Sequence, residues 1–143
     1  MNERADSATR HRIVNPESLV APSGYSHAVV AAPGRTIYLA GQTAHVPGEE
    51  TPEDIVKQFD RAARKVVIAL ETAGGRPDDL VSMQIFTTDL ADYLSKSKEV
   101  GDVYQKHFGK HYPAAALIEV KSLVGGAKVE LSSIAVVPEG ERG

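Results

Sequence analysis

The 143-residue chain contains no cysteine, and it has neither a long apolar run nor a long basic run. The absence of cysteine excludes disulfide bonds, thiolate metal sites and a cysteine nucleophile, and it is typical of the reducing cytoplasm. The first ten residues are polar and of mixed charge, without the apolar centre of a secretory signal or a membrane span. We therefore expect a cytoplasmic protein with no membrane partner.

Neither sign of charge is in large excess. The chain has 16 lysines and arginines against 19 aspartates and glutamates, which gives a formal net charge of -3. Nucleic acids and anionic membranes attract clusters of cationic side chains. This composition therefore predicts no nucleic-acid partner.

Length and composition predict one folded domain. Hydrophobic residues make up 42% and charged residues 24% of the chain, as in ordinary globular proteins. A chain of 143 residues can bury one sizeable core but not two ordinary ones. We place the domain at residues 11–137, between flexible tails at residues 1–10 and 138–143.

Strand and helix signals follow one another in a simple order. Six stretches predict strands, at residues 12–15, 26–32, 36–40, 80–88, 112–120 and 127–137. Two amphipathic stretches predict helices, at residues 51–73 and 92–108. Turn residues predict that the second and third strands form one hairpin and the last two strands another. This order predicts an α+β fold, with two helices on one face of a six-stranded mixed sheet.

The first helix has clear boundary signals. Thr51 is expected to cap it, with Pro52 at the first helical position and acidic residues in the first turn. Gly74-Gly75 is expected to end it. Since two helices can cover only one face of a six-stranded sheet, an apolar opposite face would need a partner subunit.

The predicted last hairpin carries one acid in an apolar strand. Period-2 patterning places Ala115 and Leu117 on one face of its first strand and Glu130 on one face of its second, and we expect this face to line a pocket. An ionised carboxylate between Val129 and Leu131 would cost several kcal/mol unless it were paired or hydrated. Two roles are therefore open for Glu130. It is either a proton donor or water-orienting group, or it is a structural partner of Lys128 or of an arginine across a subunit boundary.

Four segments, taken in order along the chain, carry a family resemblance. They are Gly24-Tyr25-Ser26-His27-Ala28-Val29, Leu39-Ala40-Gly41-Gln42, Val103-Tyr104 with Phe108-Gly109, and Tyr112-Pro113-Ala114 followed by Glu130. Together they resemble the RidA/YjgF (reactive intermediate deaminase) family over nearly the whole domain. The resemblance implies a YjgF or chorismate-mutase-like fold, a homotrimer with small-molecule sites between subunits, and hydrolytic deamination without a cofactor.

The resemblance also implies the site residues. Glu130 would be catalytic and would orient a water molecule or protonate the substrate. The Gly41 amide would hold the carbonyl-like end of the substrate. Tyr25, Ala115 and Leu117 would line the substrate-binding wall. Structural alternatives remain: Tyr25 could serve packing alone, and Gly41 could mark a bulge or tight bend.

The departures from the family pattern cluster where the chemistry would be. Ala115 stands where the family has the arginine that clamps the carboxylate of an imino acid, and Leu117 stands where a cysteine is common. Gly101 takes the place of a pocket asparagine, and Ala40 that of a serine or threonine. Because polar groups have become small or apolar, we expect a ligand other than a small imino acid, or none.

The five histidines do not predict a metal site. His107 and His111 are four residues apart, but Gly109 interrupts the helix that would align them. His27, beside the Tyr25 segment, is the one histidine that we consider for proton transfer. We predict neither a metal nor a cofactor.

Three functions follow from these patterns. The first is hydrolytic deamination of a small enamine or imine, or of an aminomuconate-type metabolite, at an intersubunit cleft. The alternative is a non-catalytic trimeric module that binds a small molecule or regulates a partner protein, which the missing arginine favours. The third, a ribonuclease-like activity, is disfavoured by the net charge of -3. The sequence names no physiological substrate.

Overall fold

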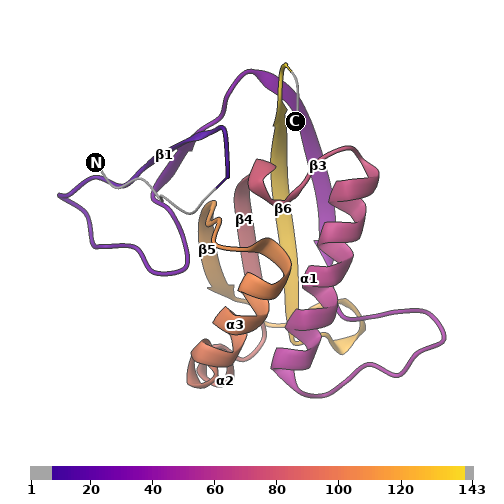
Figure 1. Cartoon of the computed structure of the whole chain (residues 1–143). Coiled ribbons are helices and arrows are strands. Elements are labelled where there is room, and N and C mark those ends of the chain that lie inside the picture. Colours follow the sequence, from indigo (N-terminus) through magenta and orange to yellow (C-terminus); the bar gives the residue numbers. More distant parts are fainter. Residues whose placement is uncertain (1–7, 141–143) are drawn as a thin grey trace.

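A computed structural model describes residues 8–140 of the chain (Figure 1). Residues 1–7 and 141–143, which hold most of the predicted N-terminal tail and half of the predicted C-terminal tail, lie outside this range. Arg10, the last residue of the predicted N-terminal tail, donates hydrogen bonds to the carbonyl oxygens of Pro138 and Glu139.

Six strands, three α-helices and two short 3-10 turns make up the described chain. The strands are β1 (Arg12–Val14), β2 (Ala28–Val30), β3 (Gly34–Gln42), β4 (Leu80–Thr87), β5 (Ala114–Glu119) and β6 (Val129–Pro138). The helices and turns are α1 (Ile55–Thr72), η1 (Pro77–Asp79), α2 (Leu90–Ser95), α3 (Ser97–Phe108) and η2 (Val124–Gly126). The α+β class predicted from the sequence is confirmed.

The strands form two sheets rather than the single six-stranded sheet that we predicted. A mixed sheet has the strand order β3-β6-β4-β5, in which β4 and β5 are parallel and the other neighbours antiparallel. β1 and β2 form a separate antiparallel pair.

Neither predicted hairpin forms. β2 pairs with β1, and β5 and β6 lie on opposite sides of β4. Helices α2 and α3 form a crossover between β4 and β5, and parallel neighbouring strands require a connection of this kind. The segment from Val120 to Lys128 is then long enough to carry the chain across the end of β4.

Helix α1 lies along the sheet and supplies much of the core. Ile55, Phe59 and Val66 are fully buried on its inner face. The cap predicted at Thr51 is wrong: Asp54 caps the helix, and its carboxylate accepts a hydrogen bond from the Lys57 amide. An aspartate placed directly before the apolar stripe satisfies the free amides of the first turn. The predicted stop is confirmed, since Gly74 takes the left-handed conformation after the helix, with φ of 97°.

The second predicted helix is divided in two. α2 ends at Ser95, Lys96 departs from helical backbone angles, and α3 begins at Ser97. The apolar stripe of this amphipathic stretch still faces inward: Tyr93, Val100, Tyr104 and Phe108 are buried, and the partly buried Val103 packs against the core.

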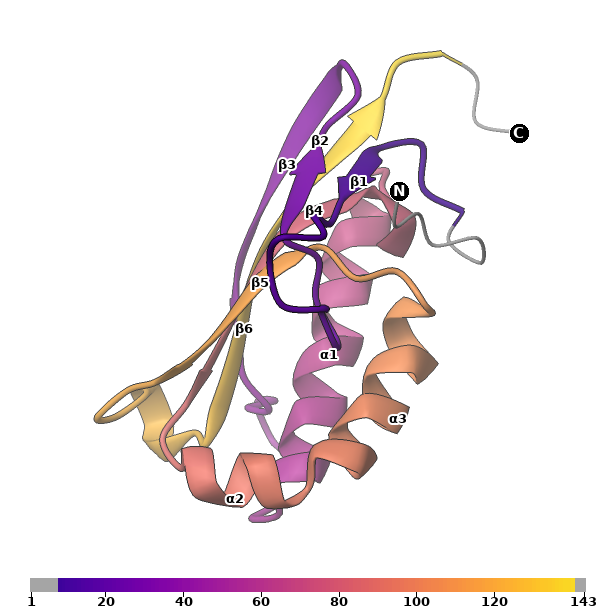
Figure 2. The same cartoon turned by 90° about the vertical axis from the view of Figure 1, so that its left-hand side faces the viewer.

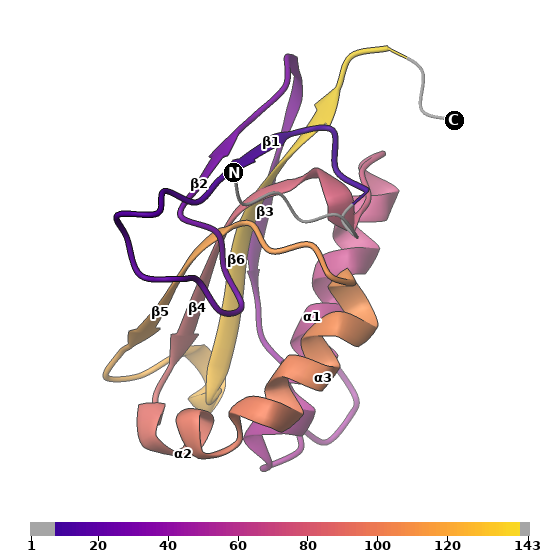
Figure 3. The same ribbon diagram turned by 60° about the vertical axis from the view of Figure 1, so that its left-hand side comes forward.

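All three helices lie on one side of the mixed sheet, and its other face carries no helix (Figure 2). Tyr38 is 78% exposed there, and Ile118 is 37% exposed. Figure 3 shows the β1–β2 pair and its loop beyond the β5 side of the sheet. The partner subunit and the homotrimer both stay predictions.

Candidate functional site

A cavity of about 470 Å³ lies between β5, the α2–α3 segment and the loop that joins β1 to β2. Three residues predicted from the sequence line it, namely Tyr25, Ala115 and Leu117, together with Gly101. The other lining residues are Ser23, Gly24, Phe59, Ile85, Tyr93, Leu94, Ser97, Val100, Tyr104, Gln105, Tyr112 and Ala116. The structure therefore brings together the three residues expected in the substrate-binding wall, whereas Gly41, the fourth predicted binding residue, does not line this cavity.

Tyrosine rings form much of the cavity wall. Tyr104 and Tyr112 stack with ring centroids 5.2 Å apart and an interplanar angle of 11°. The Tyr104 hydroxyl donates to the carbonyl oxygen of His111 at 2.7 Å, and the Gln105 amide donates to the Tyr112 hydroxyl at 2.7 Å. Burial raises the pKa of Tyr93 to about 12, so this side chain stays neutral at physiological pH. The wall is thus aromatic, hydrogen-bonded and uncharged.

Tyr25 is held at the cavity by its neighbours in the β1–β2 loop. The His27 ring meets it edge to face, with centroids 5.2 Å apart, and His27 Nε2 contacts the carbonyl oxygen of Val20 at 2.7 Å. The Ser26 hydroxyl donates a hydrogen bond to the Tyr112 carbonyl oxygen, and this bond connects the loop to the segment just before β5. His27 does not line the cavity, so its geometry fits a role in positioning Tyr25 better than one in proton transfer.

Gly41 on β3 and Glu130 on β6 do not line the cavity but lie against each other. The register of β3 against β6 shifts between Leu39 and Gln42, so Gly41 lies in a bulge. A methyl group added at Gly41 would collide with the carboxylate of Glu130. The absence of a side chain at Gly41 therefore lets the glutamate carboxylate rest directly against the β3 backbone.

The expectation that Ala115, Leu117 and Glu130 share one face is wrong. Leu117, Ile85 and the fully buried Leu131 form one cross-strand row. Because alternate residues point to opposite faces, that row faces the helices, and Glu130 in the next row faces away from them. The expectation assumed a hairpin between β5 and β6, whereas β4 separates these strands.

Glu130 has no hydrogen-bond or ion-pair partner among residues 8–140. The predicted pair with Lys128 does not form, because the Lys128 ammonium group donates to the carbonyl oxygen of Glu53 at 2.6 Å. Glu130 is only partly buried, so water can offset the cost of its charge. A carboxylate held against a backbone bulge without a cation remains available to a ligand or to another subunit.

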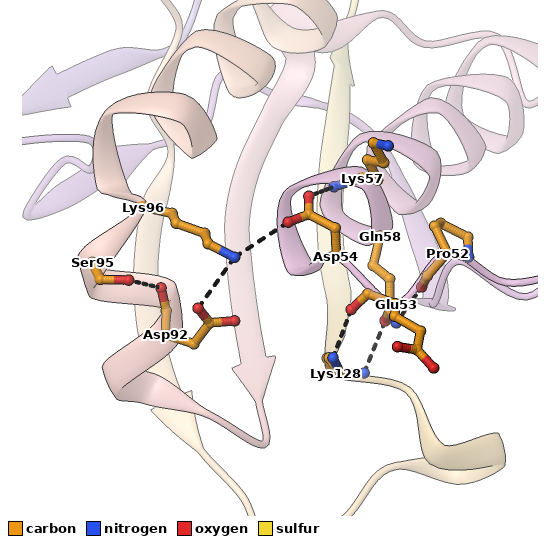
Figure 4. A network of polar contacts seen from close by, with 9 residues as sticks. All are labelled: Pro52, Glu53, Asp54, Lys57, Gln58, Asp92, Ser95, Lys96 and Lys128. Carbon is orange, nitrogen blue, oxygen red and sulfur yellow. Dashed lines mark hydrogen bonds and ion pairs between the residues drawn. The ribbon is translucent and has the colours of Figure 1, made fainter.

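A polar network fixes the end of the sheet below the cavity (Figure 4). The Lys96 ammonium group lies 3.2 Å from carboxylate oxygens of both Asp54 and Asp92, so it joins the α2–α3 junction to the start of α1. Gln58 accepts a hydrogen bond from the Lys128 amide and donates one to the Pro52 carbonyl oxygen, which joins α1 to the segment before β6. The hydrogen bonds that the Lys96 ammonium group donates to the Asp54 and Asp92 carboxylates raise the pKa of Lys96.

Sequence analysis did not predict that Tyr93 and Tyr104 line the cavity. Both lie on the buried side of the helical segments, and each also contributes to the cavity wall. Their hydroxyl groups were the available signal, because a wholly apolar core position more often carries leucine or phenylalanine.

The described residues contain no group of three or more histidine or acidic side chains placed to hold a metal ion. Within the same range, no helix is both long and apolar enough to cross a membrane.

Comparison with known proteins identifies relatives over most of the chain. Residues 16–137 match the family described as Endoribonuclease L-PSP. The chain is 32% identical over 133 residues to a 2-iminobutanoate/2-iminopropanoate deaminase from Capra hircus, covering 91% of this chain and 93% of that protein.

Solved structures give the same grouping. A protein of the conserved Rid family, YyfB from Yersinia pestis, matches with a TM-score of 0.78 and 25% identity over 89% of this chain and 98% of that one. A member of the YjgF/YER057c/UK114 family from Mycobacterium tuberculosis matches with a TM-score of 0.58 and 33% identity, over 89% and 99% of the two chains. With the fold, the cavity and the Gly41–Glu130 contact in place, these matches show that the chain belongs to the RidA/YjgF family.

Proposed function

We propose that the protein hydrolyses an imine or enamine at a cleft between two copies of the chain. Several relatives bear the name 2-iminobutanoate/2-iminopropanoate deaminase, including the Capra hircus and Bos taurus proteins. The observation that carries the proposal is the unpaired Glu130 carboxylate held against Gly41. A group that can take and return a proton is what addition of water to a C=N bond requires.

The two groups of predicted site residues lie on opposite faces of one sheet. Tyr25, Ala115 and Leu117 line the cavity beside the helices, whereas Gly41 and Glu130 lie on the uncovered face. One protomer therefore cannot bring them to the same ligand. In our proposal a second copy places its Glu130 at the mouth of the first copy's cavity, as in an oligomer with shared sites.

The chemistry needs no oxidant or cofactor. Glu130 would orient a water molecule and accept one of its protons as the oxygen bonds to the imine carbon, while the imine nitrogen gains a proton. The carbinolamine then loses ammonia: Glu130 returns its proton to the nitrogen as the C–N bond breaks and accepts the hydroxyl proton as the carbonyl forms. The Gly41 amide would donate to the oxygen that develops at this carbon.

Ammonia release from a panel of imines, generated in place from amines and amino acids by oxidases, tests the activity. We expect Glu130→Gln to reduce the enzymatic rate by about 10²- to 10⁴-fold, the range for loss of a general acid or base. Glu71→Gln, which removes an exposed carboxylate at the end of α1, is the matched control and should leave the rate unchanged. The proposal fails if the native protein accelerates no imine in the panel.

Subunit mixing tests the shared cleft separately. Glu130→Gln removes the acid, and Leu117→Trp blocks the cavity, so each variant alone should be inactive. In random 1:1 mixed oligomers about one site in four would combine two native halves, and that share of activity should return. If no activity returns on mixing, each site is built from a single chain.

The second candidate is a non-catalytic module that binds a small molecule. Ala115 favours it, because this position offers only a methyl group to the cavity. A protein that binds ligands in the cavity but accelerates no imine hydrolysis would support this candidate.

A further inference from the structure

We infer that the cavity takes an imine without a carboxylate group, either neutral or protonated on nitrogen. The inference rests on the proposed deaminase function and names its substrate class. It follows from the charges around the site, from what a second copy would add, and from the shape of the wall.

None of the described residues that line the cavity carries a charge. The wall consists of tyrosine, phenylalanine, aliphatic, glycine and serine residues with one glutamine, Gln105. A carboxylate that enters such a wall loses water and gains no cation, which costs several kcal/mol. A neutral imine loses much less hydration and gains contact with the aromatic rings.

Two lysines in this part of the fold, Lys96 and Lys128, already have partners. Lys96 is adjacent to the lining residue Ser97, but its ammonium group is shared between Asp54 and Asp92 (Figure 4). Lys128, on the segment that leads into β6, donates to the Glu53 carbonyl oxygen. Moving either lysine to a ligand would break these contacts, so neither replaces the missing cation at Ala115.

A second copy would add negative charge rather than positive charge. The strand positions that face away from the helices are Thr36, Tyr38, Ala40, Gly41, Ser82, Gln84, Phe86, Ala114, Ala116, Ile118, Glu130, Ser132, Ile134 and Val136. Glu130 is the single charged residue in this set. A carboxylate on the ligand would be repelled by Glu130, whereas an iminium group would be attracted to it.

The shape of the wall favours a flat, apolar ligand body. Four tyrosines and Phe59 line a cavity of about 470 Å³, which falls within the usual size range for small-molecule sites. Gly101 adds room, because a Cβ at that position would have no atom within 4 Å. The electron-rich ring faces also favour a cation over an anion. An aryl imine fits these properties, whereas an aminomuconate-type metabolite, which carries carboxylates, does not.

A matched pair of substrates tests the inference. Oxidation of benzylamine by an amine oxidase gives phenylmethanimine, and oxidation of phenylglycine by an amino-acid oxidase gives the same ring and imine with an added carboxylate. We expect kcat/KM for the neutral imine to exceed that for the carboxylate imine by at least about tenfold, after subtraction of spontaneous hydrolysis. Ala115→Arg should raise kcat/KM for the carboxylate imine at least about tenfold, since it supplies a bidentate partner.

The control variant is Ile68→Arg, which adds the same charge at an exposed position of α1 outside the cavity. It should leave the substrate preference unchanged. Binding is measured independently of turnover by ligand-observed NMR with benzamide and benzoate, which differ in charge but hardly in shape. We expect benzamide to bind at least about tenfold more tightly.

The outcomes separate the inference from the proposed function. Equal or faster hydrolysis of the carboxylate imine would overturn the inference and leave the deaminase proposal standing. Preferred binding of benzamide without hydrolysis of either imine would support the charge preference and overturn the deaminase proposal. If neither probe binds and neither imine is hydrolysed, both fall.

Discussion

Gly41→Ala should separate the proposed chemistry from the stability of the fold. A Cβ at residue 41 would lie 2.8 Å from Cδ of Glu130 and closer still to its Oε2, whereas ordinary contact begins at 3.4 Å, so the carboxylate would have to move by more than 0.6 Å (3.4 minus 2.8). The colliding group is the end of a flexible side chain that faces away from the core. It can move at a cost of about 1 kcal/mol or less, typical of an off-rotamer side chain.

Gly34→Ala is the matched comparison. Its Cβ would lie 2.7 Å from the carbonyl carbon of Val137, a shortfall of 0.7 Å (3.4 minus 2.7) against the same ordinary contact distance. Here the neighbour is the backbone of β6, to which β3 is paired. The strand cannot turn aside as a side chain does, so we expect a loss of about 1 to 3 kcal/mol in the free energy of unfolding, as for other overpacked sites.

The effects of the two variants on imine hydrolysis should have the opposite order: Gly41→Ala should lose more activity than Gly34→Ala. Misplacement of a reacting group by about 1 Å can cost about 10²-fold in rate, so Gly41→Ala should lower imine hydrolysis by about that factor. Gly34→Ala should keep near-native activity per folded molecule, because it lies at the far end of β3. Urea denaturation and steady-state kinetics on both variants measure the two effects. Full activity in Gly41→Ala, or a stability loss equal to that of Gly34→Ala, would refute the reasoning.

Two further predictions concern stability. The Ser133 hydroxyl is buried without a hydrogen-bond partner in the described structure. Ser133→Ala should therefore stabilise the protein by about 1 kcal/mol in urea denaturation, whereas Ser132→Ala on the uncovered face should change the stability little. If Ser133→Ala destabilises the protein, the hydroxyl has a partner. Burial alone would raise the pKa of Asp60, but hydrogen bonds from His107 and Lys106 hold it below its ordinary value of 3.8. Because the folded state binds this proton less readily than the unfolded state, the stabilising contribution is present above the unfolded pKa and is lost as pH falls through the folded pKa. Asp60→Asn should therefore lose less stability than the native protein between pH 5 and about pH 3 in thermal denaturation, and parallel curves would contradict the prediction.

Local sequence patterns predicted the elements better than their pairing. The helical period from Ile55 to Leu70 and the glycines after it marked α1 to within a few residues, since an amphipathic stripe and a stop signal are both local. The partner of a strand depends on how distant segments pack, and β6 could be placed beside β5 or across β4 without any change in its own pattern. The sequence therefore predicted a hairpin between β5 and β6, whereas the chain crosses the end of β4 between these two strands.

The same limitation affected the site. Tyr25, Ala115 and Leu117 share a cavity, so this grouping could be predicted from the family resemblance, but the contact between Gly41 and Glu130 was not predicted. The separation of the two groups onto two faces was not predicted either, because a wrong strand neighbour reverses the face to which a residue is assigned. The aromatic cavity wall was hidden for a different reason: a tyrosine that serves both core and cavity has the spacing of an ordinary helix stripe.

The position of β5 at the edge of the sheet allows ligand preference to diverge without loss of the scaffold. β4 is the only strand of the described sheet that pairs with β5, apart from one bridge between Ala114 and Ser26, and the β5 side chains from Ala114 to Ile118 are partly or largely exposed. Glu130, by contrast, lies on β6, which is paired on both sides. Exchange of residues 115 and 117 alters what a substrate touches at little structural cost, whereas the strand that carries the acid is fixed by two neighbours. A lineage could thus lose its anion anchor, keep its reactive carboxylate and move to a new class of molecules.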